Sequence, residues 1–396
     1  MDTTPPTLAI ISNGVTPYGL HSYRRMAREI PEIRLVVYYT HDYSMGEWPT
    51  EAPREFPVTR FGIGERATGK ITLPAMLHEW AKAGRVIQQL QTDSAKAVIM
   101  LGYNDLGRLR ILRWCKRNGI PLFILADSNI RGDRSSGLKA QIKQAVLPRI
   151  LAQCAGVMPC GSLGSAYFQK YGVIPDKIFL VPNEPDYTLI EQVSAEQLAQ
   201  VKEQFGLAAN HRRIIFSGRL VSLKRVDLLL QAFSQISELR QDWDMVIVGD
   251  GPQAAQLHNL TPENLRSRII WTGFIGSQAT LAALYRACDL LVLPSHYEAW
   301  ALVVNEAVAA GLAVICSHAV GAAPELIQES GNGWTFPTDD VEMLSARLQE
   351  ATSPDRIDSL KSASAAVLQA WRDKADPIAG VRSALRYCGI LSVPPQ

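Results

Sequence analysis

Short apolar runs alternate with longer amphipathic stretches along nearly the whole chain, and this alternation limits the fold more than any other feature. In the first half, the expected strands cover residues 8–12, 33–39, 96–101, 121–126, 156–160 and 178–182. In the second half they cover 213–217, 244–249, 268–272, 289–294 and 312–317, with a short strand within 331–336. Helical segments such as 74–90 and 137–154 lie between them. The pattern is typical of an α/β fold with parallel sheets covered by helices.

The chain has 396 residues, which is too many for one ordinary core and enough for two domains. The stretch Pro182–Asp186 (PNEPD) is a proline-flanked turn after an expected strand and is the best boundary. We therefore predict one Rossmann-like domain over 1–184 and a second over 185–375. The remaining 376–396 contain an amphipathic segment that predicts a helix. Open sheets of this kind bind ligands at the carboxyl ends of their strands, so two such domains would face each other across a cleft.

Net charge is only +2, but the segment 106–150 is locally basic, with ten Lys or Arg and only two Asp. A basic segment suits a phosphate-bearing lipid acceptor, an anionic glycan or a membrane face, and a solvated helix face explains it equally well. No nucleic-acid-binding motif is present, so we do not expect a nucleic-acid partner.

The six cysteines lie in apolar or helical contexts and contain no CxxC pair. They are expected to be reduced, buried thiols of a cytoplasmic protein. The first residues lack the features of a signal peptide, and no apolar run is long enough for a membrane span. Peripheral contact with the inner face of an anionic membrane remains an open alternative.

The stretch FSGRLVSLKRVD places two cations after the strand that ends at Ser217. Gly218 permits a tight turn, and Arg219 and Lys224 follow it. A planar guanidinium and a compact ammonium at one strand end suit a diphosphate. A solvated surface turn would explain the same residues. VGDGP, at 248–252, is a second strand-end glycine turn and is weak evidence alone.

The stretch SHYEAWALVVNE sets two carboxylates, Glu298 and Glu306, into a very apolar part of the chain. A helix is expected from about Ala301 to Gly311, so the N–H groups of Ala301 to Val303, including Leu302, can bind an anion. Carboxylates accept hydrogen bonds from vicinal hydroxyls such as those of ribose or hexose. The pair is therefore a candidate clamp around a diphosphate, although Glu298 alone could also be a helix cap.

Taken together, the GRL…K turn, the GDGP turn and the E-x7-E spacing resemble a retaining glycosyltransferase of the GT-B fold, and glycosyltransferase family 4 most closely. The resemblance implies that Arg219 and Lys224 bind the donor diphosphate. It implies that Glu298 contacts the donor sugar and that Glu306 accepts hydrogen bonds from the ribose. It further implies that Gly273 and Phe274 frame the base, that the loop of Gly14 approaches the phosphates, and that the last helix crosses back onto the first domain.

Two departures from the family pattern affect this assignment. Ala301 stands where the family usually has glycine, three residues after the first glutamate, and its methyl group could alter which sugar fits. PNEPD replaces the usual PNG-V-D, which affects the hinge and any role of Asn183. Asp242-Trp243-Asp244 matches the DxD metal signature of another glycosyltransferase fold, but it precedes a strand and is interpreted as a solvated turn. No metal or other cofactor is expected, because the two cations and the helix start would neutralise the diphosphate.

The acceptor is expected on the first domain, where polar residues follow the strands. The candidates are Tyr18, His21, Tyr103, Asn104, Asp127 and Arg131, with Asp127 also a candidate for a catalytic role alongside Glu298, Arg219 and Lys224. The reaction would move a sugar from a UDP, GDP or ADP sugar to a hydroxyl of a glycan, a lipid-linked or a small-molecule acceptor. Front-face attack with retention is favoured, while a double displacement through Glu298 remains an alternative.

The alternative functions are an oxidoreductase, an inactive scaffold and a sugar-nucleotide epimerase or hydrolase. A nicotinamide-dependent oxidoreductase would show a GxGxxG fingerprint after the first strand, where ISNGVTPYG stands instead. An inactive scaffold would lack one of Arg219, Lys224 or the glutamates, and all are present. A sugar-nucleotide epimerase or hydrolase of the same fold stays open, because it would use the same donor site.

Overall fold

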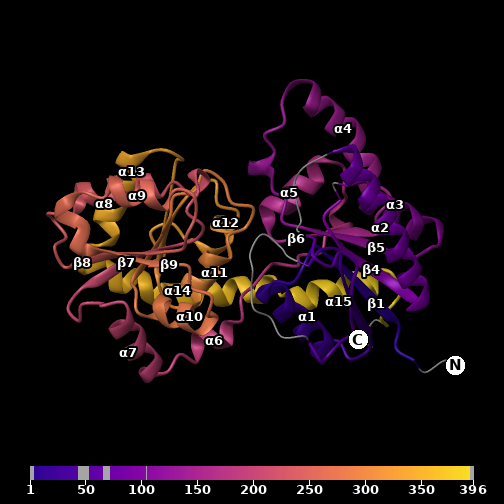
Figure 1. The fold of residues 1–396 in the computed structure, drawn as a ribbon, viewed down its shortest axis with the longest axis horizontal. Coiled ribbons are helices and arrows are strands. Elements are labelled where there is room, and N and C mark those ends of the chain that lie inside the picture. The colour runs from indigo at the N-terminus through magenta and orange to yellow at the C-terminus, as the bar shows by residue number, and fades with distance from the viewer. Residues whose placement is uncertain (1–3, 43–52, 66–71, 104, 393–396) are drawn as a thin grey trace. The chain divides into compact units, whose positions relative to one another are not determined.

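The computed structural model describes residues 4–42, 53–65, 72–103 and 105–392. The chain divides into two compact units, the first comprising 1–183 together with 375–396 and the second 184–374. Figure 1 shows each unit as a parallel sheet with helices on both faces.

The first unit is built on a six-stranded parallel sheet in the order β3-β2-β1-β4-β5-β6. Its strands are β1 (Thr7–Ser12), β2 (Arg34–Tyr39), β3 (Val58–Arg60), β4 (Ala95–Leu101), β5 (Leu122–Ala126) and β6 (Gly156–Pro159). Its helices are α1 (Pro17–Glu29), α2 (Leu73–Thr92), α3 (Leu106–Arg117), α4 (Gly137–Leu151), α5 (Ser162–Lys170) and α15 (Pro377–Tyr387). The direction of strand order reverses between β1 and β4, which is where open sheets bind ligands.

Side chains of each strand alternate between two cores. Ala9 and Ile11 of β1 face the core covered by α2, α3, α4 and α5, whereas Leu8 and Ile10 face the core covered by α1 and α15. Both faces of the sheet are buried, which explains why its strands are continuous apolar runs rather than alternating ones.

Helix α15 packs beside α1, far from it in sequence (Figure 1). Val381 and Leu385 are fully buried in the shared core. Arg25 of α1 donates to Asp376 at 2.8 Å, just before α15. Gly380 lies so close to the carbonyl of Leu180 that a Cβ there would be 2.0 Å from the oxygen. The final helix is therefore part of the first unit's core.

The second unit has a parallel sheet in the order β12-β11-β10-β7-β8-β9. Its strands are β7 (Arg212–Ser217), β8 (Trp243–Val248), β9 (Ile269–Gly273), β10 (Leu290–Leu293), β11 (Ala313–Ser317) and β12 (Gly333–Phe336). Its helices are α6 (Tyr187–Glu191), α7 (Ala195–Gln204), α8 (Val226–Ile236), α9 (Ala254–Leu260), α10 (Gln278–Arg286), α11 (Leu302–Ala309), α12 (Ala323–Leu326), α13 (Val341–Ala351) and α14 (Pro354–Lys374). Here the order reverses between β7 and β10.

The structure confirms the predicted α/β class and corrects two details. Residues 178–182 do not form a strand, although they lie beside β6: Ile178 makes a single bridge, and the N–H groups of Phe179 and Val181 donate to Val157 and Pro159 at 2.9 and 3.0 Å. The edge strand β3 was not predicted, since its three residues contain no apolar run. All six cysteines are free thiols, and five are buried. Among the described residues, no helix combines the length and apolar character needed to cross a membrane.

Candidate functional site

Three strand-end turns of the second unit are joined by backbone hydrogen bonds. The N–H of Gly218, after β7, donates to Val248 at 3.0 Å, and the N–H of Gly249, after β8, donates to Gly273 at 2.9 Å. A Cβ at Gly249, whose φ is +130°, would lie 1.9 Å from the Gly218 oxygen. Glycine is therefore required where the GRL and GDGP turns meet, and the weak GDGP signal marks a packed edge of the sheet.

Lys224 and Glu298 meet where the strand order reverses. Lys224 follows β7 in a 3₁₀ turn, and Glu298 follows the neighbouring β10. The Lys224 ammonium donates to Oε1 of Glu298, and the Ser295 hydroxyl donates to the same oxygen at 2.6 Å. Both charged side chains are mostly buried. The sequence predicted a ligand role for each residue, and the structure adds that they form an ion pair.

The loop of Glu298 is fixed by its neighbours in the sheet. The Glu298 N–H donates to Ala319 at 3.1 Å, and the Glu298 carbonyl accepts from Gly321 at 3.1 Å. The residue before α11 is Ala301, whose side chain makes no cap hydrogen bond, so Glu298 does not occupy the N-cap position of that helix.

Ala301 adopts a left-handed backbone conformation, with φ +86° and ψ 80°. This region favours glycine, the residue that the resembled family usually has here. Next to it, the buried Trp300 indole donates to Asn305 at 2.9 Å, and Asn305 donates to the Tyr187 hydroxyl at 3.0 Å. These contacts hold the start of α11, where the N–H groups of Leu302 and Val303 have no partner within the helix.

Glu306 lies inside α11 and is almost completely buried. The Tyr285 hydroxyl of α10 donates to its Oε2 at 3.0 Å. A buried carboxylate is costly unless it is hydrogen-bonded, and this bond supplies part of what it needs. Tyr285 was not predicted, because an isolated tyrosine in a helical pattern carries no signal.

Arg219 and Phe274, two further predicted donor residues, are exposed. Arg219 is exposed, and no partner of its side chain is found among the residues that the structure describes. Phe274 follows β9 and is 59% exposed, which is unusual for a phenylalanine. Gly273 before it has φ +68°. A cation and an aromatic ring therefore flank the joined turns on the surface of this unit.

The first unit contains a cavity of about 760 Å³ at the carboxyl ends of its strands. Tyr103 and Asp127, two of the predicted acceptor residues, line it together. Its wall also includes Ser128, next to Asp127, and residues that were not predicted: Asn13, Lys139, Ile142, Lys143, Val146, Ile150 and Tyr167. Tyr18 and His21 lie on α1 and Arg131 lies on the turn 130–132, all outside this lining. Asn104 falls outside the described residues.

Asp127 follows β5 and is open to the cavity, but the surrounding protein desolvates its carboxyl and raises its pKa. The Tyr103 hydroxyl lies 3.0 Å from that of Tyr167. Burial and this contact raise the pKa of Tyr103, so its phenol stays protonated at neutral pH. Asp127 is the group in this pair suited to accept a hydrogen bond from a hydroxyl.

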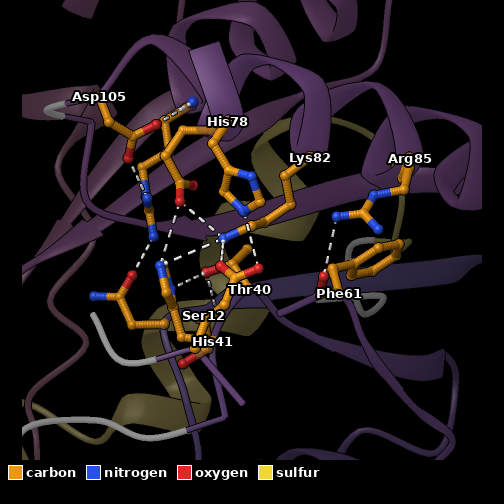
Figure 2. A network of polar contacts seen from close by, with 12 residues as sticks. Ser12, Thr40, His41, Phe61, His78, Lys82, Arg85 and Asp105 are labelled. Carbon is orange, nitrogen blue, oxygen red and sulfur yellow. Dashed lines mark hydrogen bonds and ion pairs between the residues drawn. The ribbon is translucent and has the colours of Figure 1, made fainter. Parts of the chain in front are cut away.

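The loop that carries Gly14 is held from two directions. The His41 N–H donates to the Asn13 carbonyl at 2.8 Å. The buried Arg108 guanidinium donates to Oδ1 of Asn13, to Asp105, and to the Leu101 carbonyl at 2.7 Å. Figure 2 shows Asp105 at one end of this polar network and Lys82 near its centre. Arg108 was not predicted, because one arginine in a basic helix has no distinguishing pattern.

Lys82 is 1% exposed and forms the core of the network (Figure 2). Its ammonium donates to Glu65 at 2.6 Å and to Glu79 at 2.8 Å. Burial raises the pKa of Glu79, but the hydrogen bonds from His41 and Lys82 outweigh burial and lower it to about 2. His41, Glu65 and Glu79 have metal-ligand spacing, yet the Lys82 ammonium already supplies a cation to both carboxylates.

The DxD match differs from its sequence interpretation in one respect. It lies at the amino end of β8, away from the strand ends that bind ligands, as expected. However, Asp244 is buried and lies 2.9 Å from Nδ1 of His211, so only Asp242 is solvated. We interpret Asp244 as a structural residue, because it is buried in β8 and contacts His211.

The chain is similar to known glycosyltransferases in sequence and in fold. Residues 199–364 match the family described as glycosyl transferases group 1. An uncharacterized glycosyltransferase of Methanocaldococcus jannaschii is 33% identical over 37% of this chain and 37% of its own length. The D-inositol 3-phosphate glycosyltransferase of Segniliparus rotundus is 28% identical over 55% of this chain and 49% of its own. The matches thus span about half or less of these relatives.

The crystal structure of Anabaena HepE in complex with UDP and glucose covers 98% of this chain and 100% of its own, with a TM-score of 0.71 and 17% identity. A likeness at this identity shows the fold alone, and it covers both units. The fold is accordingly of the GT-B class, and residues 199–364 are similar to the glycosyl transferases group 1 family.

Proposed function

We propose that the protein is a retaining, metal-independent glycosyltransferase of family 4 that moves a sugar from a nucleotide diphosphate sugar to an acceptor hydroxyl. The observation that carries the proposal is the Lys224–Glu298 ion pair at the reversal of strand order in the second unit. A cation and a carboxylate at this place, beside the start of a helix, match the two halves of a sugar diphosphate.

In the proposed donor site, Lys224 and Arg219 bind the diphosphate together with the N–H groups of Leu302 and Val303. Glu298 accepts hydrogen bonds from the sugar, and Glu306 accepts them from the ribose. Phe274 and Gly273 frame the base. Gly14 is proposed to carry the loop of the first unit that approaches the phosphates, and Arg108 would hold that loop in place.

The proposed reaction breaks the bond between the anomeric carbon and the phosphate oxygen through an oxocarbenium-like state. The acceptor oxygen then bonds to that carbon on the same face, and its proton passes to the departing phosphate oxygen. The products are a glycoside and a nucleoside diphosphate. Lys224, Arg219 and the amides of α11 stabilise the charge that develops on the leaving group.

The first unit is proposed to bind the acceptor in its cavity. Asp127 would accept a hydrogen bond from the reacting hydroxyl and orient it, with Tyr103 beside it. Tyr18, His21 and Arg131 remain proposals for a wider acceptor surface. UDP sugars are the first donors to test, because the related Anabaena structure holds UDP.

The decisive experiment is a thermal-shift titration with UDP, GDP, ADP and their sugars in the presence of a chelator. A nucleotide that binds only the folded state raises the melting temperature by mass action. Arg219→Ala and Lys224→Ala should weaken that nucleotide at least about tenfold, because each removes a charge-assisted contact. Lys202→Ala, on the exposed face of α7 in the same unit, is the matched control.

If no nucleotide raises the melting temperature, or if all variants show equal increases, the proposed donor site is contradicted. Product analysis then separates the remaining alternatives. A glycoside with the anomeric configuration of the donor supports retention, and an inverted product contradicts it. A freed or epimerised sugar formed at full rate without an acceptor would identify a hydrolase or epimerase instead.

A further inference from the structure

Helix α4 forms an apolar wall of the cavity in the first unit. Ile142, Val146 and Ile150, spaced four residues apart, line the cavity along one side of the helix. Ile142 is 55% exposed and Val146 is 47% exposed. Leu101 and Leu125 add apolar surface at the strand ends. Large aliphatic side chains left open in a concave site favour an apolar ligand, since covering them releases water.

The cavity also contains cationic groups on the same helix. Lys143 has partners within the protein, because it donates to Asp133 at 2.6 Å and its Nζ lies 4.9 Å from the centre of the Tyr167 ring. Burial lowers the pKa of Lys143, but the contact with Asp133 outweighs burial and raises it. Lys139 is exposed, and no ion-pair partner for it occurs in the described part of the chain. Lys139 is therefore the cation available to a ligand.

Asp127 completes the chemistry of the cavity. It follows β5 in the same lining as Lys139 and Ile142. One cavity thus offers a hydrogen-bond acceptor for a hydroxyl, a cation for an anionic group, and an aliphatic wall. Free sugars and unsubstituted glycans would use the first of these and leave the wall exposed.

We propose that this cavity binds an amphiphilic acceptor, with a linear apolar chain against Ile142, Val146 and Ile150 and an anionic group such as a phosphate at Lys139. The inference rests on the proposed function, because it assigns the acceptor of the same reaction. The volume of about 760 Å³ is within the range of sites that enclose a ligand of this size.

The test uses the full chain and monomeric alkyl phosphates below their micelle concentrations. Binding of inorganic phosphate, butyl, octyl and dodecyl phosphate is measured by calorimetry without any nucleotide. A fully buried methylene tightens binding about fourfold, so affinity should rise at least about tenfold from butyl to octyl phosphate. An affinity that does not depend on chain length overturns the proposal.

Variants locate the binding. Ile142→Asp should weaken the binding of dodecyl phosphate at least about tenfold, and Lys139→Ala should weaken the binding of all the phosphates. Two residues of the same helix outside the lining, Leu138 and Arg149, give the matched controls Leu138→Asp and Arg149→Ala. Equal losses in variants and controls would mean adsorption to an exposed helix or a membrane face, which contradicts a cavity site. The chain-length series on the unaltered protein decides the question if a variant does not fold.

The donor titration keeps the two proposals separate. Nucleotide shifts without chain-dependent binding would leave the proposed function intact and remove only the amphiphilic acceptor. If the affinity rises with alkyl chain length but no nucleotide raises the melting temperature, the amphiphile site stands and the donor site is contradicted. With both present, octyl β-D-glucoside phosphate esters should outcompete free sugars as acceptors in the transfer assay.

Discussion

At the scale of single residues, Ala301 is an alanine in a backbone conformation that favours glycine. Its φ of +86° lies in a region that costs a non-glycine residue about 1–3 kcal/mol. Ala301→Gly should relieve this strain, and the greater freedom of glycine in the unfolded chain offsets about 0.4–1 kcal/mol of the gain. We expect a net increase in the free energy of unfolding of about 0.5–1 kcal/mol, measured by denaturant titration.

Ala310, at the other end of α11, provides a control with the opposite sign. Its φ is −75°, which is ordinary helical backbone, so Ala310→Gly should cost about 1 kcal/mol. If both glycine variants lose stability equally, the strain at Ala301 is refuted. The methyl group of Ala301 also lies at the proposed donor site, so the glycine variant should be assayed with several donor sugars.

Lys82 supports a second prediction at this scale, because one buried ammonium serves two carboxylates. The pKa of Glu79 is lowered in the folded state, so its contribution to stability is present above about pH 4.5 and is lost as the pH falls toward about 2. Lys82→Met should cost about 3–5 kcal/mol at pH 7. This cost should shrink by about 1–2 kcal/mol by pH 3, since protonated Glu79 no longer needs the cation.

Urea unfolding at pH 7, 5 and 3 measures that dependence. Lys96→Met, at the exposed amino end of β4, removes a lysine of the same unit without removing a described ion pair, and it should change stability little at any pH. If the loss of unfolding free energy in Lys82→Met is the same at all three pH values, Lys82 does not stabilise the ionised form of Glu79.

At the scale of elements, the close approach of α15 to residues 178–182 gives a sharp test. A Cβ at Gly380 would lie 2.0 Å from the Leu180 oxygen, so Gly380→Ala must push the helix or the segment away. Overpacking of this kind costs about 1–3 kcal/mol, partly offset by the better helix propensity of alanine. We expect a net loss of about 1–2 kcal/mol. Ser383→Ala, exposed on the same helix, should be neutral or slightly stabilising, and equal effects would contradict the close approach.

Sequence and structure differ in part at residues 178–182, the segment that this contact involves. The run IFLVP has the composition of a strand, and its periodicity predicts one. The segment lies beside β6, where the N–H groups of Phe179 and Val181 donate to Val157 and Pro159 at 2.9 and 3.0 Å. Leu180 also approaches Gly380 of α15, an element two hundred residues later. The other apolar runs became strands because both faces of each sheet are buried. The local pattern therefore predicts the strands inside the sheets, and it places residues 178–182 correctly beside β6 without a full strand forming there.

The candidate site divides in the same way. Gly218, Lys224 and Glu298 could be found because turn glycines and charges stand at the ends of strongly apolar runs. Tyr285, Arg108 and Lys139 could not, since each lies within an ordinary helix and reaches the site only through packing. The pairing of Lys224 with Glu298 depends on β7 and β10 being neighbours, which requires the strand order and not merely the strands.

At the scale of the whole molecule, the two units differ in how the chain builds them. The second unit is one continuous segment, 184–374, whereas the first needs 375–396 to complete its core. We predict that residues 184–374 expressed alone will unfold cooperatively and will keep the nucleotide that raises the melting temperature of the full chain. Residues 1–183 alone should be unstable, because Ile378, Val381 and Leu385 would no longer cover β1 and β2. Circular dichroism melts with and without nucleotide measure both outcomes. A stable fragment 1–183 that unfolds cooperatively would show that α15 contributes little to the core of the first unit. A folded fragment 184–374 that does not bind the nucleotide would show that the donor contacts of the second unit are insufficient without the loop of Gly14.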